Sequence, residues 1–88
     1  MKARYLEITF RKGKPIAAYF YLPRMEGDRS ARTTSLGDGL LADFSADGRP
    51  IGIEITSPSS TTVETLNRAL AALSQSPVSG AEIAPLAA

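Results

Sequence analysis

The sequence predicts an α+β fold: a small antiparallel β-sheet of four or five strands with one C-terminal helix packed on one face. Three observations predict it. Two segments alternate apolar and polar residues, an Asp-Gly turn joins two further apolar segments, and a helical stripe follows at about residues 61–73. A chain of 88 residues is long enough for one small domain. We expect that domain at residues 1–73 and a flexible tail at residues 74–88.

The first hairpin is predicted from residues 5–10 and 16–22, which alternate with the period of a half-buried strand. Three cross-strand pairs would place the apolar side chains on one face: Leu6 with Phe20, Ile8 with Ala18, and Phe10 with Ile16. The same register places Tyr5, Tyr19 and Tyr21 together on the opposite face.

The second hairpin is predicted from residues 40–44 and 51–55, joined by a two-residue Asp-Gly turn at residues 47–48. The apolar pairs would be Phe44 with Ile51, Ala42 with Ile53, and Leu40 with Ile55. This register buries Phe44 and leaves Asp43 and Glu54 facing solvent.

A short third strand at residues 30–35 is suggested by a weaker pattern. For the helix, Thr61 and Glu64 fit a capping box at the N-terminus. The stripe expected to dock on the apolar sheet face consists of Val63, Leu66, Leu70 and Leu73.

Several classes of function are excluded by composition. The sequence contains no His and no Cys, which removes Ser-His-Asp triads, Cys nucleophiles, zinc fingers, and haem or iron–sulfur ligation, and no cofactor is expected. No apolar segment approaches the roughly 20 residues of a membrane span, and no signal-peptide pattern follows the first residues. We therefore expect a cytoplasmic protein that does not enter a membrane.

Two motifs are better explained by the hairpins than by chemistry. Residues 43–54 resemble a calcium loop in their oxygen ligands, but strands flank them where helices are needed, so no metal site is expected. Residues 37–42 match a dinucleotide fingerprint without the helix that must follow it. Because Asp43 and Glu54 are expected in solvent, they are poor candidates for acid–base catalysis, and no catalytic residue is assigned.

The leading hypothesis is a non-enzymatic interaction domain that forms a homodimer and engages a protein partner, because one helix can cover only one sheet face. The residues of that interface would be Tyr5, Tyr19 and Tyr21. Residues 1–32 carry a net charge of +5 and the remainder −4, which allows nucleic-acid binding as an alternative, although we expect the two halves to neutralise each other. The basic residues for the alternative are Arg4, Arg11, Lys12 and Lys14.

Residues 40–55 combine Asp43, Asp47-Gly48 and Gly52-Ile53-Glu54-Ile55 in one hairpin. This pattern resembles a small bacterial family, domain of unknown function 2283, and a looser likeness covers residues 4–57. Residues 17–22 stand where the family has a strand of the Asp-Ala-Leu-Tyr-Ile type, although basic residues replace its preceding acidic ones. The resemblance implies a small β-rich domain with no established activity. It also allows an antitoxin-like role, as the partner of a small toxin.

Overall fold

The computed structural model describes residues 3–87. The strands are β1 (Tyr5–Arg11), β2 (Lys14–Tyr21), β3 (Arg32–Gly37), β4 (Leu40–Phe44) and β5 (Pro50–Ile55). They are followed by the 3-10 turn η1 (Pro58–Ser60), the helices α1 (Val63–Ala72) and α2 (Gly80–Ile83), and the 3-10 turn η2 (Ala84–Ala87).

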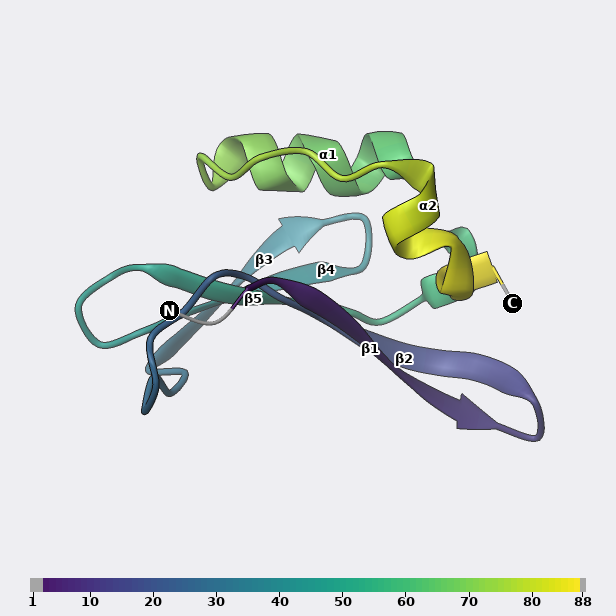
Figure 1. Cartoon of the computed structure of the whole chain (residues 1–88), viewed down its shortest axis with the longest axis horizontal. Coiled ribbons are helices and arrows are strands. Elements are labelled where there is room, and N and C mark those ends of the chain that lie inside the picture. Colours follow the sequence, from purple (N-terminus) through teal and green to yellow (C-terminus); the bar gives the residue numbers. More distant parts are fainter. Residues whose placement is uncertain (1–2, 88) are drawn as a thin grey trace.

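All five strands form one antiparallel sheet in the order β1-β2-β5-β4-β3, which confirms the predicted α+β class. Both helices lie on the same side of this sheet, so it has a covered inner face and an outer face without helices (Figure 1). No helix within residues 3–87 is long and apolar enough to cross a membrane.

The register of the first hairpin is confirmed for two of its three predicted pairs. Leu6 lies opposite Phe20, and Ile8 lies opposite Ala18. The third pair is wrong, because Phe10 lies opposite Pro15. A tight turn at Lys12 and Gly13, with φ values of 53° and 78°, fixes the end of the hairpin, and the inward pairs fix its base. Between the turn and the inward pairs, β2 contains one residue more than β1, so Ile16 forms a bulge in β2.

The second hairpin also contains a bulge, and its predicted pairing fails next to the turn. Its inner pairs, Leu40 with Ile55 and Ala42 with Ile53, are confirmed. However, Phe44 lies opposite Pro50 and is only half-buried. The loop spans residues 45–49, because the Ser45 N–H bonds the Arg49 carbonyl at 2.9 Å and only Gly48 of the Asp-Gly pair has a positive φ. The predicted two-residue turn is therefore wrong.

The core lies between the inner face and the helices. Its buried members are Ala18, Phe20, Leu22, Leu40, Ile53, Ile55, Leu66, Ala69, Leu70, Val78, Ile83 and Leu86. From the predicted stripe, Leu66 and Leu70 are fully buried, and Val63 and Leu73 pack at the margin. The helix begins one residue later than expected: the hydroxyl of Thr62 accepts the Thr65 N–H at 3.1 Å.

The segment expected to be a flexible tail instead completes the core. Ser79 and Glu82 form a capping box that begins α2, and Val78, Ile83 and Leu86 are buried. α1 is therefore not the last element of the chain. Proline and glycine hide the short helix from a periodicity search, but the Ser-x-x-Glu spacing at 79–82 is a signal that could have found it.

We predict that Leu86→Ala lowers the free energy of unfolding by roughly 2–5 kcal/mol, because it leaves a cavity in the core. Urea denaturation measures the change. Ala84→Ser, at an exposed position in the same turn, is the control and should change stability little. Equal stability of Leu86→Ala and the unmodified chain would show that the segment does not contribute to the core.

Candidate functional site

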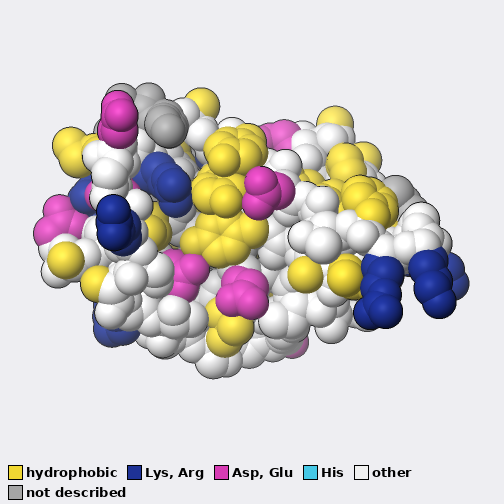
Figure 2. Space-filling model, turned by 90° about the horizontal axis from the view of Figure 1, so that it is seen from below, with side chains coloured by type: hydrophobic (Ala, Val, Ile, Leu, Met, Phe, Trp, Pro, Cys, Tyr) yellow, Lys and Arg dark blue, Asp and Glu magenta, His cyan; other side chains and the backbone are white. Residues whose placement is uncertain are grey.

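The outer face carries the three tyrosines that the sequence predicted to lie together. The rings of Tyr5 and Tyr21 stack with centroids 4.4 Å apart, and Tyr19 meets Tyr21 edge-on at 4.6 Å. We define the tyrosine face as these rings and the carboxylates beside them, namely Tyr5, Tyr19, Tyr21, Glu7, Asp43 and Glu54. Figure 2 shows this side of the molecule, with hydrophobic side chains gathered at its middle and acidic ones around them.

The position of Tyr19 depends on Gly52. Its ring lies over Gly52 of β5, where an added Cβ atom would overlap the ring. The phenol crosses β5 in this way and donates to the carboxylate of Asp43 on β4 at 2.7 Å. Glycine is unfavourable inside a strand because it packs no side chain, so a strand glycine that is covered by an aromatic ring gains the contact it lacks.

The prediction that Asp43 faces open solvent is wrong. It is half-buried and accepts three hydroxyl donors: Tyr19 at 2.7 Å, Thr33 at 2.5 Å and Ser30 at 3.1 Å. These donors come from β2, β3 and the β2–β3 loop. Among residues 3–87, no basic side chain pairs with the Asp43 carboxylate. Glu54 is exposed, as predicted.

Tyr19 and Tyr21 act as hydrogen-bond donors. Burial and the hydrogen bond to Asp43 raise the pKa of Tyr19 well above its ordinary value. Desolvation and the charge of Glu7 raise the pKa of Tyr21, whose hydroxyl lies 3.3 Å from the Glu7 carboxylate. Both phenols therefore stay protonated at neutral pH, which makes them poor nucleophiles or bases.

A shallow hollow of about 190 Å³ lies on the outer face between two carboxylates. It is lined by Glu7, Thr9, Ala17, Ala18, Tyr19 and Glu54. Glu7, Tyr19 and Glu54 occupy adjacent positions on three neighbouring strands, which places one carboxylate on each side of the phenol ring. Arg24 does not line this hollow, and its guanidinium lies 4.9 Å from the centre of the Tyr21 ring.

The basic residues of the nucleic-acid alternative do not form one surface. Arg4 donates at 2.7 Å to the carbonyls of Ser76 and Pro77, and it pairs with Glu82. Arg4 therefore ties the chain ends together beside the core. The remaining three residues stand at the end of the β1–β2 hairpin, which we call the basic tip and define as Arg11, Lys12 and Lys14.

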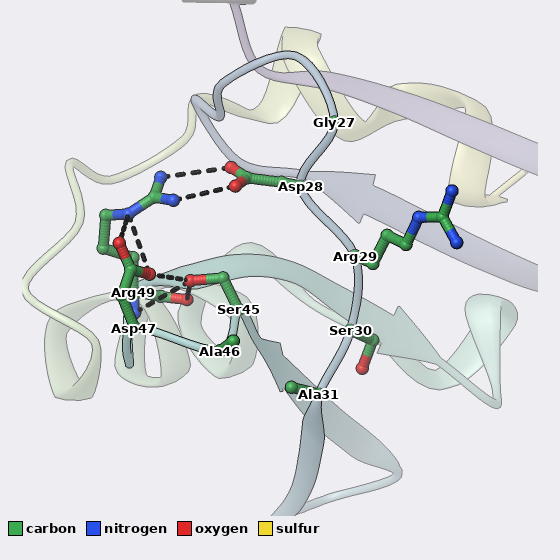
Figure 3. Close-up of a pocket in the computed structure, with 9 residues that line it drawn as sticks. All are labelled: Gly27, Asp28, Arg29, Ser30, Ala31, Ser45, Ala46, Asp47 and Arg49. Carbon is green, nitrogen blue, oxygen red and sulfur yellow. Dashed lines mark hydrogen bonds and ion pairs between the residues drawn. The ribbon is translucent and has the colours of Figure 1, made fainter.

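A second hollow, of about 390 Å³, is bordered by the β2–β3 and β4–β5 loops (Figure 3). Arg49 dominates it: its two terminal nitrogens bond both oxygens of Asp28, at 2.7 and 3.1 Å, and its Nε bonds Asp47 at 2.9 Å. The two terminal nitrogens thus tie the β4–β5 loop to the β2–β3 loop, and Nε holds the guanidinium within its own loop. Sequence reasoning missed this clamp because Asp28 is 21 residues away from Arg49.

We predict that Gly52→Ala destabilises the protein by about 1–3 kcal/mol, because the new methyl group displaces the Tyr19 ring. In a Tyr19→Ala background the same substitution should cost little, since the ring is absent. A double-mutant cycle with denaturant unfolding measures this coupling. Equal costs in both backgrounds would contradict the close contact.

We also predict that the Arg49 clamp stabilises the protein only above acidic pH. Hydrogen bonds from Arg49 and Ser45 lower the pKa of Asp47 to about 2, and the guanidinium also lowers the pKa of Asp28. A carboxylate with a lowered folded-state pKa adds stability above its unfolded value near 4, and that stability is lost as pH falls toward about 2.

The Tm of an Asp28→Asn/Asp47→Asn variant should therefore lie below that of the unmodified protein at pH 7, and most of the difference should be lost as pH falls to about 2. Asp38→Asn is the control, because its ion pair with Arg68 is exposed and spans 3.6 Å. A difference in Tm that persists unchanged at low pH would contradict this role.

Comparison with known proteins matches a protein-family model to one segment of the chain, residues 17–59. No curated protein and no solved structure matches the chain. The matched segment runs from β2 through the second hairpin to η1, so it includes Tyr19, Asp43, Gly52 and the Arg49 clamp and confirms the likeness expected from residues 40–55. Residues 17–59 match the model of the family described as Protein of unknown function (DUF2283).

Proposed function

We propose that this protein is a non-enzymatic protein-binding module and that the tyrosine face is its contact surface. The observation that carries the proposal is the contiguous cluster of three tyrosine rings on the sheet face that lacks helices. The C-terminal segment does not cover these rings, because its residues Val78, Ile83 and Leu86 pack with the core. The β2–β3 loop contributes Arg24 at the edge of the cluster.

The rings are suited to binding a protein because they are already ordered. Tyr19 is held over Gly52 by its bond to Asp43, and Tyr21 is held between two aromatic neighbours. Tyrosine is enriched at protein interfaces, where its ring becomes buried and its hydroxyl keeps a polar partner. A surface with few rotamers left to fix loses little entropy on binding.

The charge of the face favours a protein over a nucleic acid. Base stacking on a sheet needs aromatic rings next to cations that hold the phosphates. Here Glu7 and Asp43 accept hydrogen bonds from Tyr21 and Tyr19, and Glu54 lies opposite Tyr19. With three carboxylates beside the rings and Arg24 as a cation against Tyr21, the net negative charge would oppose phosphate groups where the bases have to stack.

The proposal excludes catalysis on this surface. Tyr19 and Tyr21 stay protonated, Glu54 is exposed, and the chain has no His or Cys that could act as a base or nucleophile. We also propose that the protein is cytoplasmic. An antitoxin-like role, which the family resemblance suggested, is one form that such binding would take.

Site-specific photocrosslinking in expressing cells tests the proposal. Benzoylphenylalanine at position 5 replaces a ring that is 52% exposed, so the fold should tolerate it. We expect irradiation to give a covalent adduct with a polypeptide. The matched control is the same residue at position 25, where Met25 is 54% exposed on the β2–β3 loop and should give no such adduct. Adducts with nucleic acid alone, or none at position 5, would contradict the proposal.

A further inference from the structure

We propose that the tyrosine face binds a second copy of this chain, in a two-fold dimer where the basic tip of each copy lies against the carboxylates of the other. This inference rests on the proposed function and names its partner. It depends on the complementary charges of two separate regions on the same outer face.

The basic tip concentrates positive charge that folding does not require. Arg11 and Lys14 lie directly opposite each other, and like charges at such positions destabilise a hairpin. Lys12 stands between them in the turn. Within residues 3–87 no acidic side chain pairs with any of the three. An acidic surface from another molecule would relieve this repulsion.

The tip also projects from the body of the protein. β2 pairs with β5 only from Ala18 onward, so the end of the first hairpin has no third strand beside it (Figure 1). Two apolar side chains there are half exposed, Phe10 at 50% and Ile16 at 48%. A two-stranded ribbon in water is only marginally stable, and contact with a second molecule would support it.

The tyrosine face provides the complementary surface. Glu7 and Glu54 stand on opposite sides of the hollow beside Tyr19, with the small side chain of Ala17 among its lining residues. A long basic side chain entering this hollow meets a carboxylate on each side and an aromatic ring suited to a cation. Neither glutamate pairs with a basic side chain among the described residues.

The arrangement of the two regions permits reciprocal contact. Figure 2 shows basic side chains at the hairpin end of the face and the aromatic and acidic cluster at its middle. Lys14 and Tyr19 are five positions apart along β2, which corresponds to roughly 17 Å of strand. A two-fold axis through the small residues Thr9 and Ala17, between these regions, places each tip over the other copy's carboxylates. Such an isologous contact closes on itself as a dimer.

In this dimer the two tyrosine clusters are displaced from each other, and this offset distinguishes it from direct stacking of the clusters. Direct stacking would bring the six carboxylates of two tyrosine faces together, and their repulsion would oppose association. The offset arrangement pairs opposite charges at both ends. It is therefore the form of self-association that the charge pattern favours.

The experiment mixes charge-reversed variants. Arg11→Glu/Lys14→Glu reverses the tip and keeps its like-charge pair, and Glu7→Lys/Glu54→Lys reverses the face. Sedimentation velocity of the unmodified chain should show a dimer that dissociates as salt increases. Each variant alone should lose at least ~10-fold in dimer affinity, because tip and face then carry the same sign. An equimolar mixture should regain the dimer, since both contacts of the mixed pair are again complementary.

Control variants carry the same changes of net charge elsewhere: Glu26→Lys/Glu64→Lys and Arg29→Glu/Arg68→Glu, all at exposed positions. They should dimerise as the unmodified chain does. Circular dichroism checks that every variant is folded, and the salt dependence of the unmodified dimer tests the inference without any variant.

A monomeric unmodified chain, or a dimer that mixing does not restore, would overturn the inference. Crosslinking at position 5 separates this failure from failure of the proposed function. An adduct only with a different polypeptide overturns the dimer but leaves the binding module supported. A monomer that gives no polypeptide adduct overturns both.

Discussion

The outer half of the structure depends on the close approach of the Tyr19 ring to the backbone of Gly52. Any side chain at residue 52 would block the ring, and the phenol would not reach Asp43 across the intervening strand. Through this bond, Asp43 also gathers hydroxyls from β3 and the β2–β3 loop. One missing Cβ atom therefore links four strands on a face that receives no helix, and it gives the tyrosine cluster a fixed shape.

Much of the sheet was predictable because side chains in a strand alternate strictly. The parity of Leu6, Phe20, Ala42 and Ile53 determined which pairs face inward, and the same parity placed the tyrosines together. The predicted pairs were wrong next to the turns, where one strand contains one residue more than its partner. Each hairpin accommodates the difference with a bulge, at Ile16 and at Ile51, and alternation alone cannot locate such a residue.

The finer parts of the site were beyond sequence reasoning because they depend on strand order. Placement of β5 between β2 and β4 brings Tyr19 to Asp43, and neither hairpin pattern specifies which strands of the two hairpins meet. The Arg49 clamp similarly joins loops that are distant in sequence. In contrast, the contribution of residues 78–86 was signalled by a capping motif but had no periodic apolar stripe.

The bonds from Arg4 to Ser76 and Pro77 join residues 72 and 73 positions apart. The core therefore depends on contacts of high sequence separation, which form slowly because a long loop must close first. The five strands precede Val78, Ile83 and Leu86 along the chain, so their apolar face lacks part of its cover until these three residues pack against it. Until these residues are in place, the exposed apolar face favours aggregation over folding.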